Sequence, residues 1–186
     1  METISLIPHP DFPPSHVQGV ELEFGYDYDF LYLSYRLVGA SSVILPYTGE
    51  AIRQDGLWQS TCFELFVMSK EADSYAEFNF APLFRWAAYQ FDDYRAGMKP
   101  MALTVEPHLL DSRVGERGRD FPRHYQFDAT LSRSDLPDGD AWLGLSAVIE
   151  ELDGTKSYWA LRHPAGKPDF HHRDCFALEL PAPTVA

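Results

Sequence analysis

Hydrophobic and polar residues alternate along three consecutive segments in the middle of the chain, 57–68, 75–81 and 85–91. Successive side chains of a β-strand point to opposite faces of a sheet, so this alternation predicts three neighbouring strands. One face of the predicted sheet is apolar and would pack in a core. The other face carries aromatic, carboxylate and amide side chains, namely Trp58, Glu64, Tyr75, Glu77 and Asn79. We expect this second face to be open to solvent, which makes it a candidate ligand-binding surface.

Short alternating segments also occur in the rest of the chain, and turn residues separate them. Those that predict strands are 20–24, 30–38, 42–45, 102–110 with an interruption at Pro107, 124–131, 141–150, 157–161 and 175–180. Together with the three central segments they make about ten strands, and helical periodicity is almost absent. The pattern therefore predicts an all-β, antiparallel β-sandwich of the immunoglobulin-like or jelly-roll type.

We expect the whole chain, residues 1–186, to form a single domain, because no linker, repeat or low-complexity stretch interrupts it. Four prolines favour an extended conformation for residues 1–16, and residues 181–186 form a predicted disordered tail. The charged segment Asp111–Asp120 is expected to be a mobile loop. The segment 132–137 is expected to be a turn with one helical turn and a serine cap.

The composition restricts the classes of function. The 186 residues suit a single domain with one core. A net charge of -13 argues against nucleic acid and against an anionic membrane surface, since both are bound through Lys and Arg. The N-terminal segment has no basic stretch followed by an apolar one, and no run approaches about 18 apolar residues. We therefore expect a cytoplasmic protein without a signal peptide or a membrane span.

The two cysteines, Cys62 and Cys175, are too few and too far apart to predict a disulfide framework. In the cytoplasm both would be reduced thiols, and a disulfide would need their strands to be neighbours. The alternation of the last predicted strand places Phe176, Leu178 and Leu180 on the apolar face. Cys175 would then lie on or under the polar face, as Cys62 would, and two buried structural thiols are the simplest interpretation.

Four stretches of the sequence together resemble a known family. They are LWQSTCFELFV, YAEFNFAP, RWAAYQFDDYRAGM and YWALRHPAGKPDFHHRDCFALEL. In order, spacing and residue type they resemble the bacterial DOMON-like proteins akin to the carbohydrate-binding modules of family 9, over residues 24–180. The resemblance implies a β-sandwich with a ligand face on one sheet, and DOMON-type domains as a class are associated with sugars or haem.

The resemblance also implies a set of ligand-binding residues. In the family 9 modules, aromatic side chains grip the sugar while charged and amide groups bond its hydroxyls. By this resemblance Trp58 would be the aromatic platform and Glu64 a hydroxyl acceptor. Further positions would complete the site, namely Glu77, Asn79 and Arg85 as polar partners and Phe170 and His172 as the opposite wall. The chemistry is consistent, because a pyranose presents C–H groups on its face and hydroxyls on its rim.

The same residues also allow readings without a sugar ligand. Trp58 could cover the edge of the core while Glu64 and Glu77 form structural salt bridges with Arg85 or Arg162. A metal site could use His163 and the Asp and His residues of 169–174, although adjacent histidines point apart in a strand and no zinc or EF-hand spacing is present. These alternatives stay open at the level of the sequence.

Three further functions are compatible with a β-sandwich of this composition. Haem would need axial ligands such as Met68 or Met98 with one of the late histidines, and no CxxCH motif is present. Glu64 and Glu77 could form the acid/base pair of a glycoside-acting enzyme, yet we find no nucleophile or nucleotide motif and expect no catalytic residues. A large aromatic face could also bind a protein partner or a second copy of the chain as a homodimer.

Overall fold

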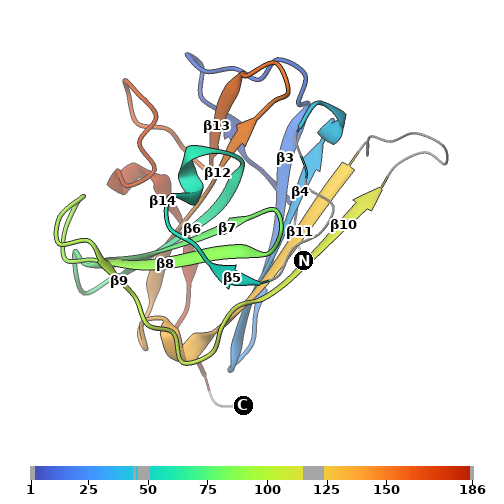
Figure 1. Ribbon diagram of the computed structural model, residues 1–186. Coiled ribbons are helices and arrows are strands. Elements are labelled where there is room, and N and C mark those ends of the chain that lie inside the picture. Colours follow the sequence, from blue (N-terminus) through green and yellow to red (C-terminus); the bar gives the residue numbers. More distant parts are fainter. Residues whose placement is uncertain (1–2, 44, 46–50, 115–123, 185–186) are drawn as a thin grey trace.

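The computed structural model describes residues 3–43, 45, 51–114 and 124–184. In these residues the chain forms fourteen strands and four short 3-10 helices, so the predicted all-β architecture is confirmed (Figure 1). Two sheets pack face to face as an antiparallel β-sandwich. Among the described segments no helix is long and apolar enough to cross a membrane.

The smaller sheet has five strands, all antiparallel. Their order is β1 (Thr3–Ser5), β3 (Gly19–Tyr26), β4 (Phe30–Val38), β11 (His124–Ser132) and β10 (His108–Val114). The outer edge of this sheet therefore includes β1, from a segment predicted only to be extended. The strand β2 follows β1 directly and pairs in the other sheet, so residues 3–8 contribute to both layers.

The larger sheet has nine strands. Its main order is β2 (Ile7–Pro8), β13 (Lys156–Ala160), β12 (Ala141–Glu150), β6 (Cys62–Ser69), β7 (Tyr75–Ala81), β8 (Arg85–Phe91) and β5 (Ile52–Arg53). Two strands lie off this path, with β14 (Phe176–Leu180) on β12 and β9 (Lys99–Pro100) on β8. All pairings are antiparallel except that of β5 with β8.

The main core fills the space between the two sheets. Its largest fully buried side chains include Phe63, Phe78 and Phe80 from the larger sheet and Tyr35 and Phe127 from the smaller one. The Phe63 ring stacks on that of Phe127 at 5.5 Å between centroids. The hydroxyl of Tyr35 donates a 2.8 Å hydrogen bond to the backbone carbonyl of Glu64, so the core also holds the backbone of β6.

The outer face of the larger sheet differs from the prediction, because it is buried as well. The strands β6 and β7 are buried along almost their whole length. A second apolar cluster covers this face and includes Phe66, Met68, Tyr75, Tyr89, Phe91, Val148, Phe170 and Phe176. Phe170 comes from the segment between β13 and the 3-10 helix η4 (Arg173–Cys175), which lies over the sheet. The expected open face was therefore wrong, since a segment distant in sequence covers it.

Several element boundaries also differ from the prediction. Residues 57–61 do not belong to the strand, because the 3-10 helix η2 (Leu57–Gln59) precedes β6. The predicted strand 42–45 is replaced by the end of the 3-10 helix η1 (Ala40–Ser42), a single bridge at Val43 and a residue outside the description. The predicted strand 102–110 begins only at His108, after Pro107, which cannot donate to a ladder.

The charged segment and the last strand need two more corrections. The first four residues of Asp111–Asp120 continue β10, and positions 115–120 lie outside the described residues. In the last strand Phe176 lies on the outer face while Leu178 and Leu180 face the main core. The cause is a register shift between Leu143 and Gly144 of β12, which interrupts the alternation. The predicted turn with a serine cap is present as the 3-10 helix η3 (Arg133–Asp135), capped by Ser132.

Candidate functional site

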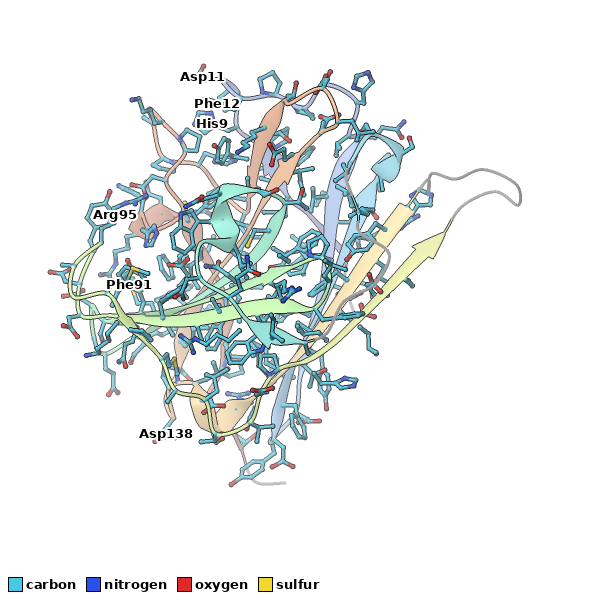
Figure 2. All side chains as sticks on the ribbon, in the orientation of Figure 1. His9, Asp11, Phe12, Phe91, Arg95 and Asp138 are labelled. Atoms are coloured by element: carbon cyan, nitrogen blue, oxygen red, sulfur yellow. The ribbon has the colours of Figure 1, made fainter. Side chains whose placement is uncertain are left out.

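A cavity of about 330 Å³ lies on the outer face of the larger sheet. Its lining comes from the sheet, from the segments after β8 and β13, and from η2. The lining residues are Trp58, Glu64, Phe66, Glu77, Phe91, Arg95, Met98, Val148, Tyr158, Pro168, Phe170 and His171. Figure 2 shows Phe91 and Arg95 at one end of the sheet, where β8 ends. Four of the seven predicted site residues, Trp58, Glu64, Glu77 and Phe170, therefore line one cavity.

Two buried carboxyl groups form the polar part of the floor. Glu64 and Glu77 are 2% and 4% exposed. Glu64 on β6 pairs with Asn79 on β7, and Glu77 pairs with Phe66, so the two glutamates are diagonal neighbours on the same face. Ser146 on β12 stands beside Glu64 and donates a 3.0 Å hydrogen bond to its Oε2. The strand register thus fixes both carboxyl groups in one small area.

Burial changes the acidity of both glutamates. It raises the pKa of Glu64 to about 8, and the neighbouring Glu77 adds to the rise while the hydrogen bond from Ser146 opposes it. Burial also raises the pKa of Glu77 to about 7, against the hydrogen bond from Asn79 and the charge of Arg95. Near neutral pH the two carboxyl groups therefore retain protons that exposed glutamates would have lost.

Asn79 supports the site from beside the cavity. Its side chain is completely buried, and its Nδ2 donates a 2.7 Å hydrogen bond to Oε1 of Glu77. It does not line the cavity, so its role in the structure is to hold Glu77. The Oδ1 atom of Asn79 is buried and has no hydrogen-bond partner among the described residues.

Trp58 reaches the cavity from η2 instead of from the strand. The backbone of Gly56 is in the left-handed region with a φ of 78°, which starts the 3-10 turn and which glycine adopts without strain. The Trp58 ring packs edge-on against that of Tyr89 at 5.9 Å and stays 39% exposed. Part of this large ring is therefore accessible at the rim.

Arg95 is a lining residue that the sequence reasoning missed. It lies in the turn after β8 and has a φ of 51°, a value that alternation cannot reveal. Its Nη2 and Nε atoms donate hydrogen bonds of 2.7 and 3.2 Å to Oδ1 of Asp169. The hydroxyl of Tyr94 donates to the other oxygen of Asp169 at 2.5 Å. These contacts join the turn after β8 to the segment before η4 across one side of the cavity.

His171 is the second missed residue. Its Nδ1 lies 2.7 Å from the hydroxyl of Tyr75, and its Nε2 lies 3.8 Å from Oε2 of Glu77. The ring also packs edge-on against Phe66 and Phe91, each at 5.1 Å. Burial, together with the charge of Arg95, lowers the pKa of His171 to about 4, so the imidazole is neutral at neutral pH. The HH pair in the sequence was the available signal, but only its first member faces the cavity.

The structure does not bring Arg85 or His172 to the cavity. Arg85 is the first residue of β8, beside Ala81, and lies outside the lining. His172 caps η4 by accepting a 3.2 Å hydrogen bond from the backbone of Asp174, and it lines a neighbouring hollow. One alternative from the sequence was that Glu64 and Glu77 form structural salt bridges with Arg85 or Arg162. Within the described residues, neither arginine forms an ion pair with either glutamate.

The described residues also bear on the metal and thiol hypotheses. Over the described ranges, no three His, Cys, Asp or Glu side chains gather closely enough to hold a metal ion. Both Cys62 and Cys175 are buried free thiols. The Cys175 thiol contacts the carbonyl oxygens of Arg162 and Asp169, each at 3.2 Å, so it packs inside the covering segment.

The sequence matches no family model, and no curated protein sequence shows significant similarity to it. Solved structures do share the fold. A candidate carbohydrate-binding protein from Bacteroides uniformis is 17% identical with a TM-score of 0.69, over 94% of this chain and 84% of that one. A carbohydrate-binding module of family 9 from Caldicellulosiruptor kristjanssonii in complex with glucose is 10% identical with a TM-score of 0.52, over 94% and 81%.

The same family 9 module in complex with cellotriose gives a TM-score of 0.51 at 10% identity, over 94% of this chain and 79% of that one. At these identities the likeness shows the fold. The chain therefore has a β-sandwich of the kind found in family 9 carbohydrate-binding modules. The DOMON-like part of the resemblance stays a prediction.

Proposed function

We propose that this protein binds a small carbohydrate in the cavity on the outer face of the larger sheet and does not transform it. The observation that carries the proposal is the combination of an accessible Trp58 ring with two buried carboxyl groups around one cavity. The shared fold supports it, since structures of this kind include a family 9 module with bound glucose and cellotriose. The cavity volume of about 330 Å³ lies at the small end of ligand sites, which suits one or two sugar rings.

Each lining residue then has a distinct role. The ring of Trp58 would contact the C–H face of the sugar, and Phe170 would enclose it from the covering segment. Oxygens of Glu64 and Glu77 would accept hydrogen bonds from hydroxyl groups. Arg95 would donate to a hydroxyl or ring oxygen with the N–H groups that Asp169 leaves free. Recognition of this kind needs neither a nucleophile nor a bound metal.

Isothermal titration tests this proposal. The purified protein is titrated with glucose, cellobiose, N-acetylglucosamine and a muropeptide, and Trp58→Ala is compared with Tyr28→Ala. Tyr28 is an exposed aromatic residue in the turn between β3 and β4, outside the cavity lining, so its removal is the matched control. We expect Trp58→Ala to weaken sugar binding on the order of fivefold or more, because stacking on an aromatic ring contributes about 1 kcal/mol or more. Equal affinity in both variants, or no binding to the wild type, would contradict the proposal.

A further inference from the structure

The cavity has an excess of acidic groups. Glu64 and Glu77 both line it, whereas Arg95 is the one cationic residue among its described lining residues. Arg95 makes two hydrogen bonds with Asp169, so its charge is balanced by a third carboxylate. His171 is neutral at neutral pH because burial lowers its pKa. No described lining cation is therefore left to balance the two glutamates when they ionise.

Each glutamate also has one oxygen without a hydrogen-bond partner in the part of the chain that the structure describes. Ser146 donates to Oε2 of Glu64, and Asn79 donates to Oε1 of Glu77. Within the described residues, Oε1 of Glu64 and Oε2 of Glu77 accept no hydrogen bond, and Nε2 of His171 lies 3.8 Å from Oε2 of Glu77. Both side chains are more than nine-tenths buried and both line the cavity. Two unpartnered acceptors thus face a space large enough for a ligand.

We propose that the cavity binds a sugar that carries an ammonium group, a cationic amino sugar, with the ammonium bonded to the free oxygens of Glu64 and Glu77. This inference rests on the proposed sugar-binding function and names the class of sugar. An ammonium group has three donors and no acceptor, so it can serve both free oxygens at once. The apolar lining from Phe66, Val148 and Tyr158 would enclose the ring to which the ammonium is attached.

Charge explains why an ammonium is preferred to a hydroxyl or an anion. A hydroxyl has a single proton to donate and leaves one carboxyl oxygen without a partner. An anionic sugar would be repelled by the ionised glutamates. A cation in a desolvated site next to carboxylates forms charge-assisted hydrogen bonds, which are about twice as strong as neutral ones. Binding a cation therefore favours ionisation of the two carboxyl groups, and the complex should release protons as it forms.

Other titratable groups also lie around the cavity, and burial keeps two of them, Tyr75 and Cys62, protonated near neutral pH. Arg95 and Asp169 form one ion pair, and Tyr75, Tyr89, Tyr158 and His171 are further titratable residues on the neighbouring elements. Burial raises the pKa of Tyr75 to about 12, so its hydroxyl stays protonated. Cys62 lies beneath Glu64 on β6, and burial keeps its thiol protonated. The two glutamates, with pKa values of about 8 and about 7, change charge near neutral pH.

The test uses two pairs of probes that differ only in the ammonium group. One pair is glucosamine and glucose, and the other is cyclohexylamine and cyclohexanol. Titrations are run in buffers of different ionisation heat, which reports the protons released. The variants are Glu64→Gln and Glu77→Gln, with Glu71→Gln as a control because Glu71 is an exposed carboxylate in the turn after β6, away from the cavity.

We expect the ammonium probe of each pair to bind on the order of tenfold tighter than its hydroxyl partner, with proton release. The preference should disappear in Glu64→Gln and Glu77→Gln and persist in Glu71→Gln. Affinity for cyclohexylamine should rise between about pH 6 and pH 8, because the glutamates ionise in this range while an alkylammonium stays charged up to about pH 10.

The outcomes separate this inference from the proposed function. Glucose that binds as tightly as glucosamine, or a preference that survives in both Gln variants, would overturn the cationic ligand and leave sugar binding intact. Binding of cyclohexylamine without any sugar would support the cation site and overturn the sugar. No binding of any probe would overturn both.

Discussion

The two faces of the larger sheet are both buried, but they are buried in different ways. The inner face packs on a second sheet, and its side chains are almost all apolar. The outer face is covered by η2, by the turn after β8 and by the segment before η4. On β6 and β7 the buried carboxyl groups, Glu64 and Glu77, lie on the outer face, where the covering elements leave a cavity of about 330 Å³.

The comparison indicates that the same strands serve stability on one side and form, on the other, the cavity that we propose for recognition. Phe63 and Phe66 are three residues apart on β6, and both rings are buried, yet one stacks in the main core and the other lines the cavity. The inner face keeps the strands in register, and the register places Glu64 and Glu77 next to each other. The outer face can hold the polar groups Glu64 and Glu77 because packing of the inner face fixes the positions of the strands.

The largest expected effect comes from truncating one ring on each face. We expect Phe63→Ala to lower the free energy of unfolding by about 4 kcal/mol, since it removes a close-packed core ring. Phe66→Ala should cost less, about 2–3 kcal/mol, because Phe66 already borders a cavity that water can enter. Urea denaturation measures both values. Equal losses would show that the two faces are packed alike, which would break the comparison.

The second prediction concerns the pH dependence of stability. The pKa of Glu64 is raised to about 8 and that of Glu77 to about 7, so the folded state holds protons that the unfolded state has lost. Stability should therefore fall as pH rises toward 8, by about 1–2 kcal/mol between pH 6.5 and 8, a window in which His171 is neutral in the folded state. Below about pH 6.5 the lowered pKa of His171 has the opposite effect, because protonation of this residue in the unfolded state makes stability fall as the pH falls.

Thermal or urea unfolding of the wild type and of Glu64→Gln checks this prediction. The Gln variant should lose less stability over the same pH window, because one of the two carboxyl groups with a raised pKa is gone. Glu179→Gln is the matched control, since Glu179 is a mostly exposed partner of Lys70 on β14. A slope that is unchanged in Glu64→Gln would place the pH dependence elsewhere in the molecule.

The smallest expected effect on stability concerns the contact that closes one side of the cavity. Asp169→Asn removes the negative charge that pairs with Arg95. Because Arg95 is half-exposed, we expect the free energy of unfolding to fall by about 1 kcal/mol or less. The freed guanidinium should change ligand affinity more than it changes stability. Asp73→Asn, which removes an exposed pair with Arg173, is the control for a surface ion pair. A sugar affinity equal in both variants would show that Arg95 does not contribute to recognition.

Much of the fold could be predicted from the sequence, because alternation is a local signal. The ranges of β4, β7, β8 and β12 match the predicted segments, and the polar face was assigned to the correct side of the sheet. What alternation cannot show is whether a face is covered. Residues 168–171 contact the outer face although they follow Glu64 and Glu77 by about a hundred positions, and no local sequence pattern predicts that contact.

The site was predictable to the extent that its residues lie on regular strands. Glu64, Glu77 and Asn79 follow from the period of two, and their proximity follows from strand pairing. Arg95 and His171 do not, because one lies in a turn with left-handed backbone and the other in an irregular segment. Arg85 was expected in the site from the family resemblance, but it is the first residue of β8 and lies too far along the strand to line the cavity. Distance along a strand therefore has to be considered together with facing.

The way the lining residues are distributed along the chain has a consequence for folding kinetics. The cavity needs Trp58 before β6, Arg95 after β8 and His171 after β13, and β6 must first pair with β12, some eighty residues later in the chain. Non-local pairings of this kind make sandwiches fold slowly, on the order of milliseconds to seconds. We expect the cavity to be complete only after the rate-limiting step, so a bound ligand would slow unfolding and leave the rate of refolding unchanged.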